Sequence, residues 1–524
     1  MLYLFYSKKL IMKNSEHLFY LIKSLSKSEK KSFKLIVNQY SKGDDNNYTL
    51  LFDTIGQMEV YNHELLIKKL KNKVKAVNIS PLKVQLTKII LKSLRNKYST
   101  SNVSFRITMY IDYIAILFEK GLYAQAKKIL SKAKEVAIEN ELYLQLDNLA
   151  IWEYKIADKE SNKEDIKSYL EKTYVTIKKA RELNDILAEF EFLQAKIRLI
   201  ALEGKTISSK STVLQLEEII QNPVMKLEIE NYSSSCQADY HSIWGHYHFI
   251  KGNKHESYDH RKKAFELIPF KPFIIREWLT YARQLLNGLS KFKMYEEYTI
   301  ELAYMLDKIK QVPKEVRTNS FEDELNTTLF NLNLNNDLTE GNFSEIQEYI
   351  EEIEVLLTTT TYQIDCNLRM VFQYNLCYAY IGSGNYKRAL LWSNSLINNT
   401  SGLREDLQCN VRIMNICIHY KLGNFGLIEN LIQSTSRFLN KKNRLNEIEL
   451  AFLDFSKTNL IAPNVNKLVI QKDLNNLELL RNSEEAKSTL DYFDFISCLK
   501  SIIENKTMEN IIKEATTVNS DSVS

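Results

Sequence analysis

Apolar residues recur along most of this chain at spacings of three and four positions, with polar residues between them. This period places the apolar side chains on one face of an α-helix, so the pattern predicts an all-α protein. Amphipathic segments also come in pairs, namely residues 142–158 with 163–182, 184–203 with 209–222, and 273–288 with 291–310. Short polar stretches separate the members of each pair, as expected for helical hairpins.

A three-residue phrase, Gly-Asn-aromatic, recurs between such segments. It begins at Gly341, Gly384 and Gly423, and looser copies begin at Gly252 and Gly121. Each copy follows an apolar helix and precedes a second helix, and glycine suits the tight turn that must join them. The recurrence predicts stacked helical hairpins.

The positions around these glycines resemble the tetratricopeptide repeat. The copies that carry the resemblance are Leu376-Cys377, Tyr380, Gly384-Asn385-Tyr386 and Ala389; Tyr113-Ile114, Leu117, Gly121, Tyr123, Ala126, Leu130 and Ala133; and Trp244-Gly245, His248, Gly252, Ala264 and Pro269. The chain also resembles bacterial repeat proteins of about this length that open with the run found at residues 26–31. The resemblance implies an α-α superhelix, a TPR-like solenoid of stacked hairpins, that binds a protein or peptide on its concave surface.

If the family's geometry applies to the two best adjacent units, one set of residues would line that concave groove and contact a partner. The set is Tyr374, Tyr378, Ile381, Ile413, Tyr420 and Lys421. Aromatic side chains of this kind anchor helices or extended peptides. An equally favoured alternative is that these six side chains only pack between neighbouring units. The lysine and asparagine clamp by which some family members hold C-terminal carboxylates is not found.

Shifts in pattern divide the chain into four parts. Residues 12–100 are predicted to form a basic helical region, 101–440 the TPR-like repeats, 441–505 C-terminal capping helices and 506–524 a disordered tail. Ser26 and Glu29 form a predicted capping box at the start of a helix. Translation is expected to start at Met12, because the eleven preceding residues add nothing to the helix that follows and do not form a signal peptide.

Composition agrees with long helices joined by short loops. Thirteen Gly and six Pro among 524 residues are too few for the many turns of a sheet protein of this size. The six cysteines include no C-x-x-C pair, which suits free thiols in a reducing cytoplasm. No run of about 20 apolar residues is present, so no contact with a membrane is expected.

Charge is distributed unevenly. Residues 1–100 carry 19 Lys+Arg and 7 Asp+Glu, a balance of +12, whereas the whole chain carries +5 and the remainder therefore −7. This asymmetry supports an alternative function, in which the basic N-terminal region contacts nucleic acid while the repeats sense a partner. Lysines on solvated helix faces explain the same charge. This explanation is favoured, because no helix-turn-helix is evident in the region.

Motifs for catalysis and cofactor binding are missing from the sequence. It has no G-x-x-x-x-G-K-[ST], G-x-G-x-x-G, H-E-x-x-H or G-x-S-x-G, so neither an enzyme nor a bound cofactor is expected. Five of the eight histidines do cluster, namely His241, His246, His248, His255 and His260. Their spacing matches no metal-site signature, and packing is favoured over a metal or pH-sensing role. The sequence predicts a non-catalytic scaffold or adaptor.

Overall fold

The computed structural model describes residues 16–40, 47–70, 79–160, 163–203, 210–270, 274–313, 317, 319–358, 364–399, 404–442, 444–461 and 467–521. Within these ranges every regular element is a helix and none is a strand, so the predicted all-α class is confirmed. No helix in the described ranges is both long and apolar enough to cross a membrane. Met12 and the final residues 522–524 lie outside the described ranges.

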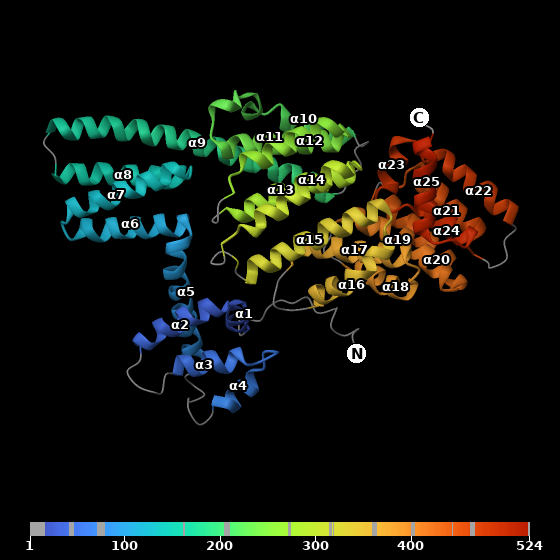
Figure 1. Ribbon diagram of the computed structural model, residues 1–524, viewed down its shortest axis with the longest axis horizontal. Helices are drawn as coiled ribbons and strands as arrows, with labels where there is room; N and C mark the ends of the chain where they lie inside the picture. The colour runs from blue at the N-terminus through green and yellow to red at the C-terminus, as the bar shows by residue number, and fades with distance from the viewer. Residues whose placement is uncertain are drawn as a thin grey trace.

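The first five helices form a module with its own hydrophobic core (Figure 1, blue). They are α1 (His17–Ser24), α2 (Lys27–Tyr40), α3 (Asn47–Gly56), α4 (His63–Leu70) and α5 (Ile79–Ser101). Phe33 and Phe52 stack at its centre with ring centroids 4.3 Å apart. The predicted capping box is confirmed: the Glu29 N–H donates to Ser26 Oγ at 3.2 Å, and the Ser26 N–H donates to Glu29 Oε2 at 2.6 Å.

Most of the next helices pack against the helix before them. They are α6 (Val103–Glu119), α7 (Tyr123–Glu139), α8 (Tyr143–Glu160), α9 (Lys163–Glu203), α10 (Lys210–Ile220), α11 (Ser234–Lys251), α12 (Lys254–Leu267), α13 (Ile275–Lys291) and α14 (Tyr295–Lys310). The short 3-10 helices η3 (Pro223–Lys226) and η4 (Ile229–Asn231) join α10 to α11. Helix α6 also contacts α8, the first helix of the following hairpin.

Helix α9 differs from the prediction. The sequence pattern divides this region into helices at 163–182 and 184–203, but the structure has one helix of 41 residues. It packs against α8 and also against α10 and α11, and so joins the α6–α8 stack to the middle of the molecule (Figure 1). Leu183 and Asn184 at the expected break neither fix φ nor favour a turn as Gly or Pro would, so the helix continues.

A second series of hairpins follows. It comprises α15 (Asn319–Glu340), α16 (Phe343–Thr358), α17 (Cys366–Gly382), α18 (Tyr386–Ile397), α19 (Glu405–Lys421) and α20 (Phe425–Lys441). The first helices of successive hairpins contact one another, α13 with α15, α15 with α17 and α17 with α19. These first helices therefore form a row of contacting neighbours, which we call the inner row.

The predicted glycine turns are confirmed. Gly121, Gly252, Gly341, Gly384 and Gly423 all have positive φ, between 70° and 79°, and each lies between the two helices of a hairpin. In this left-handed region a side chain would strain the backbone, which is why the phrase begins with glycine.

The C-terminal helices continue the core of the hairpins before them. They are α21 (Glu447–Asn459), α22 (Lys467–Leu480), α23 (Glu484–Leu490), α24 (Phe495–Glu504) and α25 (Met508–Asp521). One cluster of buried apolar side chains extends from Leu334 to Met508, so the core is continuous across the predicted boundary at residue 440.

The last helix occupies most of the region where a disordered tail is predicted. Met508 is 2% exposed and Ile511 is 5% exposed. The Glu509 carboxylate accepts hydrogen bonds from the backbone N–H and the hydroxyl of Ser344, both at 3.0 Å, at the start of α16. A helix N-terminus favours a carboxylate, so this contact holds α25 against the α15–α16 turn.

Candidate partner-binding surfaces

The predicted groove residues lie on two neighbouring helices of the inner row. Tyr374, Tyr378 and Ile381 are on α17, and the other three are on α19, which packs beside it. The structure therefore brings the set together. The side chains of Tyr374, Tyr378, Ile381 and Ile413 are buried, with exposed fractions of 3%, 7%, 2% and 0%.

A C-terminal segment of the same chain covers Tyr374 and Tyr378. The Tyr374 hydroxyl donates to the backbone carbonyl of Tyr492 at 2.9 Å, and Tyr378 meets Phe493 edge to face with centroids 5.1 Å apart. Burial raises the pKa of both tyrosines, which remain neutral hydrogen-bonding groups. The segment lies between α23 and α24, and α24 contacts α19. Contact between these four residues and a partner stays a prediction, and for Tyr374 and Tyr378 it requires this segment to move.

Tyr420 and Lys421 lie at the end of α19, where side chains are only partly buried. Tyr420 meets Phe425 edge to face at 5.5 Å, and the Lys421 ammonium lies 5.9 Å from the centre of the Tyr386 ring. The first contact lies within the α19–α20 hairpin, and the second joins this hairpin to the preceding α17–α18 hairpin. Lys421 therefore packs between two units and Tyr420 packs within one unit, and a contact with a partner stays a prediction for both.

Two helices of the N-terminal half, α6 and α8, expose apolar side chains. On α6, Phe105, Tyr113 and Ile116 are 46%, 44% and 54% exposed, and their spacing places them on one face of the helix. On α8, Leu144 is 63% exposed and Ile151 is 36% exposed, again on one face. Because α6 and α8 pack together, these stripes form an apolar surface on adjacent helices. We call it the α6–α8 surface.

The α6–α8 surface is not evident from the sequence, although one signal marks its position. The first of the repeat copies begins at Tyr113-Ile114. The structure buries Ile114 completely and leaves Tyr113 exposed. Charges of both signs border the surface at one end, where Lys120 and Lys155 are exposed beside exposed Glu119 and Asp158.

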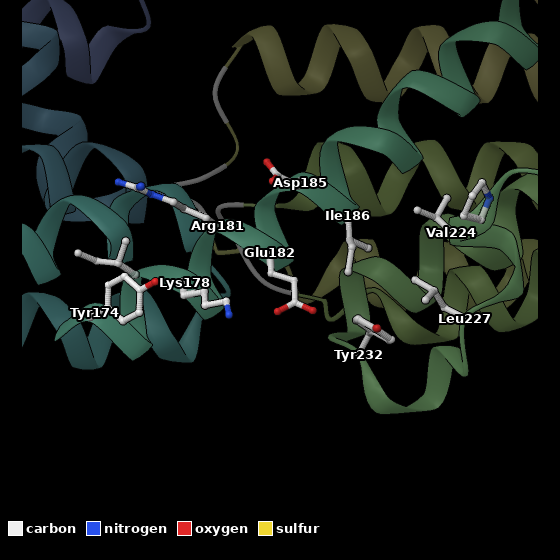
Figure 2. Close-up of a pocket in the computed structure, with 11 residues that line it drawn as sticks. Tyr174, Lys178, Arg181, Glu182, Asp185, Ile186, Val224, Leu227 and Tyr232 are labelled. Carbon is white, nitrogen blue, oxygen red and sulfur yellow. The ribbon is translucent and has the colours of Figure 1, made fainter. Parts of the chain in front are cut away.

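A second open feature is a groove along the middle of α9 (Figure 2). Its volume is about 720 Å³, enough for several side chains. One wall is α9 and the other is the η3–η4 connection; the lining residues are Tyr174, Ile177, Lys178, Arg181, Glu182, Asp185, Ile186, Pro223, Val224, Leu227 and Tyr232. Tyr174 is 66% exposed, so a large aromatic side chain at one end of the groove faces solvent.

The structure brings three of the clustered histidines together across the α11–α12 hairpin. His241 Nδ1 and His260 Nδ1 are 2.9 Å apart, so one ring donates and the other accepts, and the accepting nitrogen must be unprotonated. His248 stacks on His260 with centroids 5.6 Å apart. Burial and the charges of its two neighbours lower the pKa of His260 to about 4. Among the described residues, no group of His, Cys, Asp or Glu is arranged to hold a metal ion.

Because the pKa of His260 is low in the folded protein, we expect the protein to lose stability in acid. We expect the substitution His260→Gln to reduce this loss. An unfolded histidine binds a proton below about pH 6.5, whereas folded His260 does so only below about pH 4, so acidification across that window favours unfolding. We expect the urea midpoint to fall further for the native chain than for His260→Gln between about pH 7.5 and pH 5, by the equivalent of about 1 kcal/mol. Equal falls would contradict the prediction.

The comparison must be made between variants because other groups titrate in the opposite sense. Burial raises the pKa of Asp239 and of Asp337 to about 6. These carboxyl groups bind protons more readily when folded, and so they stabilise the fold on acidification. Subtracting the two pH profiles removes this shared contribution.

Several lysines of the basic N-terminal region make contacts within the module. Lys34 pairs with Asp53 at 2.9 Å, and Lys83 donates to the Tyr61 hydroxyl at 2.5 Å. Lys31 and Lys88 are exposed on α2 and α5. The contacts account for part of the positive charge, and nucleic-acid binding stays a prediction.

Comparison with known proteins gives no role for these surfaces. No protein-family model matches the chain, and no curated protein matches it. A functional inference therefore rests on the α6–α8 surface, the α9 groove and the contacts that cover Tyr374 and Tyr378.

Proposed function

We propose that this protein is a non-catalytic, TPR-like scaffold or adaptor that binds a protein segment on the α6–α8 surface. The observation that carries the proposal is the exposed apolar stripe of Phe105, Tyr113 and Ile116 on α6, continued on α8 by Leu144 and Ile151. Exposed apolar patches that extend over neighbouring elements are typical of sites that partners cover. Paired helices with an exposed inner row suit a role in holding partners, as in other helical repeat proteins.

The form of the surface favours an amphipathic helix or an extended segment as its ligand. Two adjacent helices with apolar stripes leave a shallow depression between them that apolar side chains can fill. All six cysteines are free, which supports a cytoplasmic location for this function.

Ile116→Glu tests the proposal against a matched control. Ile116 is 54% exposed on α6, and Leu427 is 50% exposed on α20, far along the chain. Placing a carboxylate at the centre of an apolar contact should weaken binding at least about tenfold, because the charge must lose its water. The measurement is the amount of each partner that is retained from lysates of the native organism. It is compared between the native protein, Ile116→Glu and Leu427→Glu.

We expect one set of partners to be retained by the native chain and by Leu427→Glu, and to be lost from Ile116→Glu. Retention of the same partners by Ile116→Glu would show that the α6–α8 surface is not the binding site. Circular dichroism and the melting temperature of the three proteins control for unfolding.

A further inference from the structure

Helix α5, which runs from the N-terminal module to α6, has one packed side and one open side (Figure 1). It contacts α2, α3 and α6. On the packed side, Leu86, Ile90 and Ser93 are 0%, 0% and 1% exposed. On the opposite side, Val84 is 56% exposed and Leu91 is 51% exposed. Two aliphatic side chains of this helix therefore face solvent.

The charge of α5 is all of one sign. The helix carries five Lys or Arg residues and no Asp or Glu. Lys88, Lys92 and Arg95 are exposed. Arg95 pairs with Asp112 of α6, but the two side chains are 56% and 47% exposed. An exposed pair of this kind contributes little, so Arg95 can also contact a carboxylate of another molecule.

Exposed aliphatic and basic residues alternate along one stripe of α5. Its members are separated by four, three and four residues, and they are Val84, Lys88, Leu91 and Arg95. This spacing keeps them on one side of the helix, and it is the spacing of the seam along which two helices pack in a coiled coil. Each seven residues thus offer one aliphatic side chain and one cation. We call this stripe the α5 seam.

We propose that the α5 seam binds an acidic amphipathic helix of another protein. The aliphatic side chains of that helix pack on Val84 and Leu91. Its carboxylates pair with Lys88 and Arg95, and no anion on α5 competes with them. A helix fits because its own apolar and acidic residues can recur at the spacing of the seam. The function proposed for the α6–α8 surface uses other helices, so either proposal can fail alone.

Nucleic acid is the other polyanion that a basic helix could bind, and the α5 seam fits it less well. Phosphates pair with Lys and Arg, but they gain nothing from aliphatic side chains placed between the cations. None of the four residues of the seam is aromatic, so the seam offers no ring on which a base could stack. The alternation of aliphatic and basic residues therefore favours a protein helix.

Binding of a labelled synthetic helix to the full-length chain tests the proposal. The probe is a peptide of about 21 residues, or three heptads, in which leucine and glutamate alternate at the spacing of the α5 seam. A control peptide has lysine in place of each glutamate. By fluorescence anisotropy, we expect the native chain to bind the acidic peptide with a dissociation constant below about 100 µM, and the basic peptide at least about tenfold more weakly.

Two double variants separate the contributions of charge and apolar contact. The charge variant, Lys88→Glu with Arg95→Glu, should weaken binding of the acidic peptide at least about tenfold, because carboxylates then face carboxylates. The alanine variant, Val84→Ala with Leu91→Ala, keeps every charge and should weaken binding at least about fivefold through lost apolar contact. Alanine favours helices, so this variant should fold as the native chain does, which circular dichroism checks.

Lys172→Glu with Lys179→Glu is the matched control, because these two lysines are exposed on α9 at the same seven-residue spacing. It should bind the acidic peptide as the native chain does. No binding by the native chain at about 100 µM, or equal binding by the alanine variant, would overturn the proposal. Binding of a DNA duplex of about 20 base pairs that only the charge variant loses would assign the α5 seam to nucleic acid instead. A native dimer that the charge variant dissociates would assign it to a second copy, and would equally overturn the proposal.

Discussion

Replacing Phe495 with alanine is expected to lower the free energy of unfolding by about 3–5 kcal/mol, the usual cost of removing a fully buried phenylalanine. Phe495 begins α24, is 0% exposed and packs against Phe452 of α21 with ring centroids 4.7 Å apart. It also belongs to the continuous core that includes α17 and α19. The cavity would therefore open beneath the segment that covers Tyr374 and Tyr378.

Two measurements identify the origin of this loss. Urea unfolding of Phe495→Ala should show the lower midpoint, while Phe192→Ala, at a side chain that is 53% exposed, should stay close to the native value. Hydrogen exchange should become faster in α17 and α19 than in α2 and α5, because the C-terminal segment then opens more easily. Equal midpoints for the two variants would contradict the assignment of Phe495 to the core.

The covering of the predicted groove illustrates what the sequence could not reveal. The contact between Tyr374 and the carbonyl of Tyr492 joins residues 118 positions apart. Helical periodicity shows that Tyr374 has an apolar environment, but it does not show whether a ligand or the chain itself provides it. The resemblance to the tetratricopeptide repeat implies that α17 and α19 lie in an inner row; it does not predict that the segment before α24 covers Tyr374 and Tyr378.

Features that depend on a few neighbouring residues could be predicted from the sequence, because those residues themselves determine the local backbone conformation. Each glycine of the recurring phrase adopts positive φ, and the Ser26–Glu29 capping box forms within four residues. The predicted division of α9 into two helices was wrong, since the expected break contained no residue that ends a helix. Likewise α25 is polar enough to resemble a tail, and only its contact with distant Ser344 shows where it packs.

Alanine in place of Gly382 is expected to be the most damaging of three identical substitutions. A Cβ at this position of α17 would lie 2.1 Å from Cδ1 of Phe343, which is 1% exposed and begins α16. The ring cannot move within the packed core, so α16 and α17 would have to separate. We expect a loss of about 3 kcal/mol or more in the free energy of unfolding, at the upper end of overpacking costs.

Gly384 and Gly426 provide the comparisons. At Gly384 a Cβ meets nothing within 4 Å, but φ is +77°, so alanine should cost about 1–2 kcal/mol through backbone strain alone. Gly426 lies in the first turn of α20, where a Cβ again meets nothing within 4 Å, and alanine should stabilise the helix by up to about 1 kcal/mol.

The expected order of urea midpoints is therefore Gly382→Ala lowest, Gly384→Ala intermediate and Gly426→Ala at or above the native chain. Because the chemical change is the same in all three, the order reports only the space and the φ angle at each position. A midpoint for Gly382→Ala equal to that of Gly384→Ala would show that α16 and α17 do not approach as closely as the contact with Phe343 requires. The recurring phrase marks Gly384, whereas the greater constraint lies two residues earlier, where only the packed structure reveals it.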